Sequence, residues 1–205
     1  IDRTQHHQVE SHWTDAGEVP VEWFNSSDPH WSGGTVFSDV RQITIDGTAA
    51  DAWQAISRIG GTTGWYYANW LWKLRGFFDQ LIGGAGLRRG RRHPDEIRTG
   101  DAIDFWRASV VEPGKRLLLI AEMKLPGQAA LEFQIFPLEN GKTKIVQIAR
   151  FLPSGLAGLA YWYSVTPLHE FIFTGMLRGV ARATHCKVNG RPQRASLDLL
   201  KPVVV

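Results

Sequence analysis

The sequence predicts an α+β fold in which a curved antiparallel sheet wraps around a long helix near the carboxy terminus. Residues 101–152 contain about four strand-like segments separated by tight turns, which is typical of an antiparallel meander. Residues 155–184 then form a largely helical stretch. The chain has 205 residues, of which 43% are hydrophobic and 21% charged, so we expect one main soluble globular domain.

One strand and two helices are predicted before the meander. Residues 35–46 have the pattern of a strand and end at a turn, Asp46-Gly47. Thr48 and Asp51 resemble a capping box for a helix over 49–59, which Gly60-Gly61 ends. A second helix is expected over 68–82, because its apolar residues recur at helical spacing. These residues are Trp70, Leu71, Leu74, Phe77, Phe78, Leu81 and Ile82, whereas Lys73, Arg75, Asp79 and Gln80 lie elsewhere. We expect the apolar stripe to close a cavity.

The meander is predicted to contain strands over 102–111, 116–125, 128–136 and 143–151. Its turns lie at 112–115, 126–127 and 139–142, and Asn140-Gly141 is the strongest hairpin signal. Alternation should place these side chains on one face: Ala121, Met123, Leu131, Phe133, Ile145, Gln147 and Phe151. Within the helical stretch that follows, Thr166 and Pro167 offer a point where one helix could end and another begin.

The formal charge of +3 is unevenly distributed. Residues 73–98 carry seven cations against three acids, so the pI of 9.2 reflects one basic patch and gives little support for nucleic-acid binding. Four arginines of this patch could contact an anion or a neighbouring domain, or could form a solvated loop: Arg88, Arg89, Arg91 and Arg92. The glycines of residues 83–90 have the wrong spacing for a dinucleotide-binding fingerprint.

Several classes of protein are disfavoured by simple features. Cys186 is the only cysteine, so an intrachain disulfide is impossible, and a cytoplasmic location is the default expectation. Residues 151–168 lack charge, but their glycines and prolines favour a buried helix over a membrane span. No signal peptide is in view at the start of the sequence. His6, His7 and His12 match no zinc-site spacing, so no metal site is expected.

The aromatic segment from Trp65 to Trp72 could line a pocket for a flat or oily ligand, although core packing would explain it equally well. We expect about half of its aromatic residues to touch a cavity, with Trp72 outside because it leaves the apolar stripe. The candidate ligand-binding residues are Trp65, Tyr66, Tyr67, Trp70, Phe77, Trp106, Met123, Phe133, Gln147 and Tyr163.

Acid–base candidates are Asp104, Glu122 and His169, because apolar neighbours shift the proton affinity of such groups. Glu132 and Tyr163 are further candidates of the same kind. Alternation could equally place Glu122 and Glu132 on the outer face of the sheet, and no recognised catalytic signature is present.

Five sequence stretches resemble one family: WSGGTVFSDV, GGTTGWYYANWLWKLRG, GGAGLRRGRRHPDEIRTGDAIDFWR, AEMKLPGQAALEF and YWYSVTPLHEFIFTGMLR. Together, over residues 31–182, they resemble domain of unknown function 2867, within the START-like superfamily of helix-grip folds. The resemblance implies a bent sheet around the last helix, with a ligand cavity between them. It also implies an attached, short-chain-dehydrogenase-like NAD(P)-binding domain. No activity is assigned to the family.

We therefore expect a connecting arm over 1–34, a helix-grip domain over 35–185 and a tail over 186–205. The leading functional hypothesis is binding of a small apolar or amphipathic molecule between the sheet and the final helix. One alternative is a cyclase, hydrolase or isomerase that uses polar groups in the same cavity. Another is a structural or regulatory role beside an attached NAD(P)-binding domain; we expect the chain itself to bind no cofactor.

Overall fold

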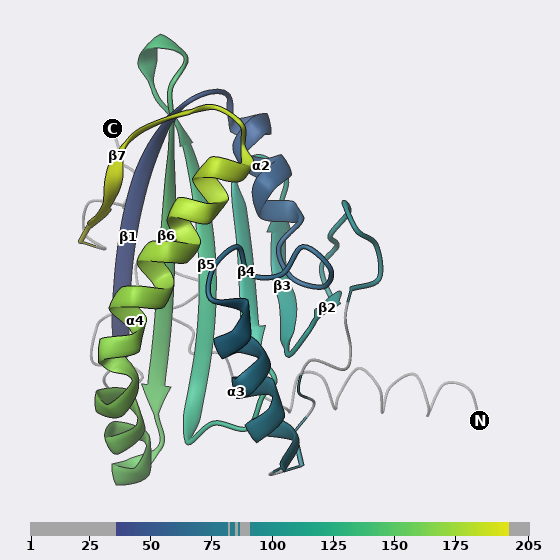
Figure 1. The fold of residues 1–205 in the computed structure, drawn as a ribbon, viewed down its shortest axis with the longest axis vertical. Coiled ribbons are helices and arrows are strands. Elements are labelled where there is room, and N and C mark those ends of the chain that lie inside the picture. Colours follow the sequence, from purple (N-terminus) through teal and green to yellow (C-terminus); the bar gives the residue numbers. More distant parts are fainter. Residues whose placement is uncertain (1–35, 82, 85, 87–90, 197–205) are drawn as a thin grey trace.

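The protein is described by a computed structural model that covers residues 36–81, 83–84, 86 and 91–196. These residues form one antiparallel sheet, in the order β2-β3-β4-β5-β6-β1-β7, with three α-helices on one of its faces (Figure 1). The strands are β1 (Phe37–Asp46), β2 (Ala102–Ile103), β3 (Trp106–Glu112), β4 (Arg116–Ala121), β5 (Gly127–Pro137), β6 (Thr143–Pro153) and β7 (Lys187–Arg194). The helices are α2 (Ala49–Ser57), α3 (Asn69–Leu81), α4 (Gly155–Ala183) and the short 3-10 helix η2 (Glu139–Gly141). The predicted α+β helix-grip class is confirmed.

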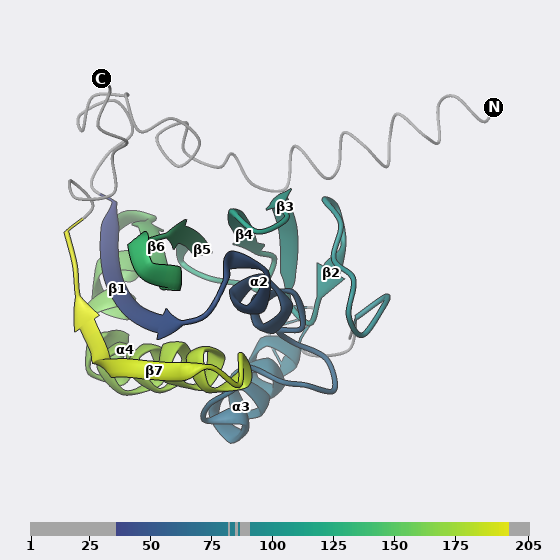
Figure 2. The same cartoon turned by 90° about the horizontal axis from the view of Figure 1, so that it is seen from above.

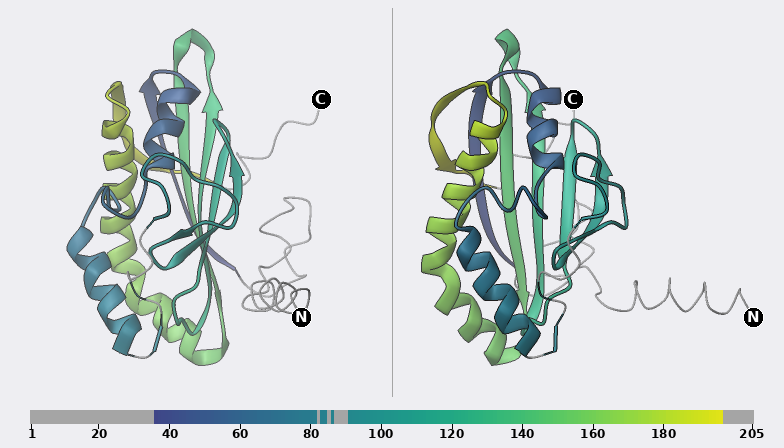
Figure 3. Two further views of the ribbon diagram at one scale, coloured as in Figure 1. Left: turned by 90° about the vertical axis from the view of Figure 1, so that its right-hand side faces the viewer. Right: turned by 45° about the vertical axis from the view of Figure 1, so that its right-hand side comes forward.

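The sheet curves around the long helix α4, as the view from above shows (Figure 2). Strands β5 and β6 form the centre of the sheet, with Phe133 opposite Gln147 and Ile135 opposite Ile145. The inner faces of these strands bury Leu131, Phe133 and Ile145 beneath the helices, as the alternation predicts. The helices form a second layer that lies against this face of the sheet (Figure 3).

Helix α2 begins as the sequence predicts. The backbone N–H of Asp51 donates to the Thr48 hydroxyl (3.3 Å), and the N–H of Thr48 donates to the Asp51 carboxylate (2.8 Å). This reciprocal capping box satisfies two backbone donors at the start of the helix. Ala52 and Ile56 then face the sheet and are fully buried.

Helix α3 has a different buried face from the one that we expected. Trp72, Gly76 and Asp79 are its buried residues. The carboxylate of Asp79 accepts the backbone N–H groups of Lys124 (2.7 Å) and Gly86 (2.8 Å), which fixes the end of the helix against the loop after β4. An acidic residue is buried here because two backbone donors need an acceptor.

Helix α4 is continuous, so a break at Pro167 is not found. The Thr166 hydroxyl does not cap a new helix; it donates to the carbonyl of Trp162 (2.8 Å), one turn earlier. The charge-free run 151–168 spans the end of β6 and the first part of α4, and it is only partly buried: Trp162 is 8% exposed and Tyr163 66%. None of the helices in the described part of the chain is long and apolar enough to cross a bilayer.

Two strand assignments also differ from the sequence prediction. The predicted strand 102–111 is divided into β2 and β3, because Asp104 has a left-handed backbone conformation (φ 54°). Part of the expected tail belongs to the sheet, since β7 pairs with the amino-terminal strand β1. Strand β7 is a largely exposed edge strand, and its polar sequence therefore lacks a buried face that could signal it.

Candidate functional site

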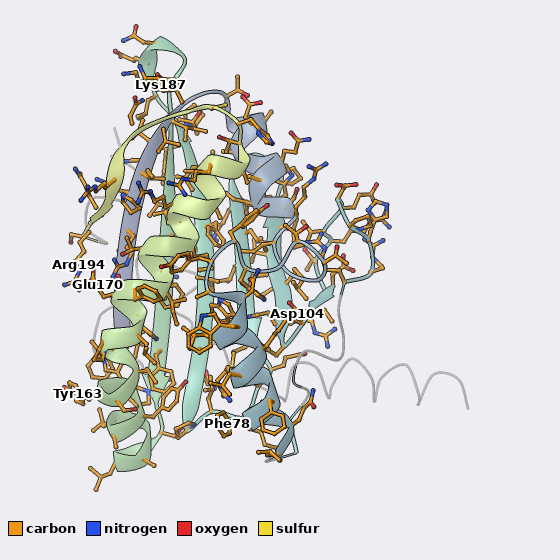
Figure 4. The ribbon with its side chains drawn as sticks, viewed as in Figure 1. Phe78, Asp104, Tyr163, Glu170, Lys187 and Arg194 are labelled. Carbon is orange, nitrogen blue, oxygen red and sulfur yellow. The ribbon has the colours of Figure 1, made fainter. Side chains whose placement is uncertain are left out.

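A cavity of about 270 Å³ lies between helices α3 and α4 and the inner face of the sheet. Helix α3 contributes Leu71, Trp72 and Phe78 to its wall; Phe78, on the lower half of α3 in Figure 4, is 52% exposed. The other wall residues include Trp106, Met123, Ala149, Phe151, Trp162, His169 and Phe173. The lining is therefore mostly apolar and aromatic, and the volume is near the lower end of the range for small-molecule sites.

The wall formed by α4 is a column of aromatic rings. Trp162 stacks on Phe151 with a centroid distance of 5.8 Å. His169 lies edge-on between Trp162 (4.9 Å) and Phe173 (4.8 Å). Burial lowers the pKa of His169 to about 4; the charge of Arg41 adds to this effect, and that of Asp39 opposes it. The imidazole is consequently uncharged at neutral pH.

The opposite wall belongs to an aromatic cluster of Trp65, Trp72, Phe105 and Trp106. Trp65 is at its centre, with ring centroids 5.1 Å from Trp72, 6.1 Å from Phe105 and 5.9 Å from Trp106. Trp72 and Trp106 line the cavity, whereas Trp65 is buried behind them. The glycine-rich segment before α3 thus places an indole beneath both cavity-lining tryptophans.

Asp104 holds this cluster in place. Its carboxylate accepts the indole N–H of Trp65 (2.9 Å) and the backbone N–H of Gly61 (3.2 Å). Burial raises the pKa of Asp104, while these two bonds and the charge of Arg91 act in the opposite direction. The side chain does not line the cavity, so this acid–base candidate acts here as a structural residue.

Two of the ten predicted ligand-binding residues, Trp106 and Met123, line the cavity. Three others lie on the surface, which corrects the prediction: Trp70 is 64% exposed, Phe77 57% and Tyr163 66%. For Trp70 and Phe77 the cause is the phase of α3, whose apolar residues extend beyond its cavity face onto its solvent face. Tyr163 packs against Phe37 on the outer side of α4 (Figure 4).

The other five predicted residues do not line the cavity. Trp65, Phe133 and Gln147 are fully buried behind it. The Tyr66 hydroxyl donates to the carbonyl of Ala55 (2.7 Å), and the ring of Tyr67 packs against Phe171. Tyr66 and Tyr67 thus join the segment before α3 to α2 and α4.

Trp72 was expected to lie outside the cavity, and that prediction was wrong. Of the five aromatic residues between positions 65 and 72, it is the one that lines the cavity. Sequence reasoning also missed Trp162 and Phe173, although both lie in the predicted final helix. Their spacing with His169, at steps of seven and four residues, is a helical stripe and could have identified this wall.

Two acidic candidates, Glu122 just after β4 and Glu132 on β5, form ion pairs. Glu122 makes two bonds with Arg107, at 2.8 and 3.1 Å. Glu132 is 0% exposed and binds Arg116 (2.6 Å) and Arg150. Burial raises the pKa of Glu132, but the two arginine charges outweigh burial and hold it below its usual value. Neither carboxylate lines the cavity. Of the acid–base candidates Asp104, Glu122 and His169, only His169 lines it.

The two described arginines of the basic turn, Arg91 and Arg92, donate hydrogen bonds to acceptors of the same chain. Arg91 donates to three backbone carbonyls, those of Ile59 (2.6 Å), His93 (2.8 Å) and Glu96 (3.0 Å). Arg92 forms a two-bond pair with Asp101. These contacts differ from the expected anion or domain contact, because the donors bind acceptors of the same chain. Arg88, Arg89, the arm 1–34 and its histidines lie outside the described residues.

Comparison with known proteins assigns the chain to a family. The model of DUF2867, a protein family of unknown function, matches residues 31–176. The chain belongs to this family. No curated protein matches the chain. Within the part of the chain that the structure describes, no group of three or more histidine, cysteine, aspartate or glutamate residues could hold a metal ion.

Solved structures with a similar arrangement have low sequence identity. The Zhui aromatase/cyclase from Streptomyces sp. R1128 is 13% identical, with a TM-score of 0.45 over 73% of this chain and 94% of its own. Norcoclaurine synthase from Thalictrum flavum is also 13% identical, with a TM-score of 0.45 over 73% and 84%. An HSP90 activator from Plasmodium falciparum is 6% identical, with a TM-score of 0.41 over 76% and 100%.

Proposed function

We propose that this protein binds a small apolar or amphipathic molecule in the cavity between α3, α4 and the sheet. The observation that carries the proposal is the cavity of about 270 Å³ with its mostly aromatic and aliphatic wall. A well-packed protein interior leaves few spaces larger than a water molecule, so an apolar space of this size favours a ligand.

The position of α3 supports a role as the outer cover of the site. Leu71, Leu74 and Phe78 line the cavity from this helix, and Leu74 and Phe78 are also partly exposed to solvent. A ligand that fills the cavity would remove their inner surfaces from water, at roughly 25 cal/mol for each Å² of apolar area. Apolar contact is thus the main source of affinity in this proposal.

Fluorescence titration with the neutral probe N-phenyl-1-naphthylamine tests the proposal. Ala149 lines the cavity and is 5% exposed, so Ala149→Phe should fill the space and weaken binding about tenfold or more. Ala160→Phe is the matched control, because Ala160 is an exposed residue of α4 outside the cavity wall. Equal probe affinity in the wild type and both variants would contradict binding in this cavity.

A second candidate function is contact with another domain through the solvent face of α3. Trp70, Phe77 and Leu81 are all more than half exposed, and large exposed apolar side chains grouped on one helix favour an interaction surface. We propose an attached NAD(P)-binding domain as the partner. Cofactor titration of a longer protein that contains it, with and without residues 31–205, tests this role. Unchanged cofactor affinity and stability would count against it.

An enzymatic role in cyclisation, hydrolysis or isomerisation has weaker support. Such chemistry needs polar groups that converge on the bound molecule. Among the three candidates, His169 lines the cavity, whereas Asp104 and Glu122 form structural contacts elsewhere. The binding proposal therefore comes first.

A further inference from the structure

Arg75 adds a positive charge to the mostly apolar wall of the cavity. It belongs to α3, on which Leu71, four residues earlier, and Phe78, three residues later, line the same cavity. Residues at these spacings share one face of a helix, so Arg75 lies on the cavity face of α3. Arg75 is half-buried, and its neighbours Leu74 and Phe78 are partly exposed. The charge therefore lies at the rim, where the cavity approaches solvent.

The guanidinium of Arg75 is held at this rim by a neutral acceptor. Its Nη2 atom donates to the backbone carbonyl of Lys124 at 3.0 Å. Lys124 lies between Met123 and Leu125, which both line the cavity, so the bond joins α3 to the loop after β4 at the cavity wall. A carbonyl oxygen has no net charge, and a guanidinium has five N–H donors. The bond thus orients Arg75 but does not neutralise it.

The acidic residue of α3 does not neutralise Arg75 by an ion pair either. Asp79 lies one helical turn after Arg75 and is 0% exposed. Its carboxylate oxygens accept the backbone N–H groups of Lys124 (2.7 Å) and Gly86 (2.8 Å) rather than those of the guanidinium. Within the part of the chain that the structure describes, Arg75 forms no ion pair.

The wall as a whole therefore has more positive than negative charge. No aspartate or glutamate is among the described residues that line the cavity. The second arginine of the wall, Arg150, pairs with the buried Glu132. Burial lowers the pKa of His169 to about 4, so this residue is uncharged at neutral pH. Arg75 is thus the charge of the wall that a ligand could balance.

We propose that the cavity binds an amphipathic anion, with its apolar body between α3, α4 and the sheet and a carboxylate on Arg75 at the rim. A carboxylate is planar and carries one negative charge, so it matches the two-donor edge of a single guanidinium. A head group at the rim also keeps part of its hydration, which a fully buried charge would lose. This inference rests on the proposed binding function and adds the charge of the ligand.

Three compounds with the same ring and the same chain length separate the effect of charge from apolar binding. They are 4-(2-naphthyl)butanoate, 4-(2-naphthyl)butan-1-ol and 4-(2-naphthyl)butan-1-amine, which are negative, neutral and positive at neutral pH. Each is titrated into the whole chain by isothermal titration calorimetry. For one partly exposed charge pair we expect the carboxylate to bind about tenfold more tightly than the alcohol, and the amine to bind more weakly than the alcohol.

Variants of α3 test whether Arg75 causes this preference. Arg75→Gln should lower the carboxylate-to-alcohol affinity ratio to about one and leave the affinity for the alcohol nearly unchanged. Lys73→Gln is the matched control, because it removes the same charge from an exposed position of the same helix outside the cavity wall, and it should preserve the ratio. Arg75→Lys keeps the charge but lacks the two-donor edge, so it should retain part of the preference.

The salt dependence of binding to the wild type gives a readout that needs no variant. Added sodium chloride should weaken binding of the carboxylate and leave that of the alcohol nearly unchanged, because salt screens a charge pair at a solvent-exposed rim. Equal affinities for carboxylate and alcohol would overturn the inference but leave apolar binding intact. An equal fall of the ratio in Arg75→Gln and Lys73→Gln would also overturn it. If none of the three compounds binds, the proposed binding function fails as well.

Discussion

Replacing His169 by phenylalanine is expected to make the protein less sensitive to acid. In the folded protein His169 lies between Trp162 and Phe173, and burial lowers its pKa from 6.5 to about 4. In the unfolded chain the imidazole regains its ordinary pKa. Protons therefore bind the unfolded state more strongly between these two values, and stability falls as the pH decreases through this range.

The size of the effect follows from the two pKa values. One pKa unit corresponds to about 1.4 kcal/mol, so full protonation of His169 should cost about 3 kcal/mol of folding free energy. The loss is absent above about pH 7 and reaches about 2 kcal/mol near pH 5. His169→Phe keeps a ring between Trp162 and Phe173 but cannot titrate. The free energy of unfolding of this variant, relative to that of the wild type, should therefore rise by about 2 kcal/mol as the pH is lowered from 7.5 to 5.

Urea unfolding at a series of pH values measures this difference directly. Other acidic groups titrate in both proteins, so the difference between the two curves isolates His169. His185→Asn is a suitable control: this histidine is exposed, and its left-handed backbone (φ 58°) is one that asparagine readily adopts. Parallel wild-type and His169→Phe curves from pH 7.5 to pH 5 would refute the reasoning.

Three substitutions away from the cavity should destabilise the protein in urea unfolding. Glu132→Gln should cost about 3 kcal/mol because it leaves two arginine charges without their buried partner, whereas the exposed control Glu139→Gln should change little. Asp79→Ala should lower the free energy of unfolding by about 2–4 kcal/mol, since two backbone N–H groups lose their acceptor. A stability equal to the wild type would show that this carboxylate does not fix the end of α3. Gly158→Ala should destabilise although alanine favours helices, because its methyl group would clash with the carbonyl oxygen of Pro126; a more stable variant would contradict this packing.

The elements that sequence predicts well are those with a strong local signal. The Thr48 capping box and the meander turns are specified by nearby residues, so α2 and strands β3 to β6 could be located. Strand β7 has no comparable signal, because an edge strand with both faces polar shows neither alternation nor a buried run.

The candidate site was harder to predict because α3 has apolar residues around most of its circumference. A hydrophobic stripe identifies the buried face only when the other face is polar, and here Trp70 and Phe77 face solvent while Asp79 is buried. The carboxylate of Asp79 accepts two backbone N–H groups, one from Gly86 just after the helix and one from Lys124 after β4, and the second contact is not visible in the local sequence. The helical spacing of Trp162, His169 and Phe173, in contrast, was available in the sequence and marks the α4 wall.

Strand β7 also determines how the sheet ends. Without it, β1 would expose a row of unpaired backbone groups, and such an edge is a template for pairing between copies of a protein. The added strand is polar and mostly exposed, and Arg194 is tied to Glu170 on α4. At the other end of the sheet, β2 has only two residues. Both margins of the sheet are thus poor surfaces for intermolecular strand pairing, which protects a protein with a large apolar interior from aggregation.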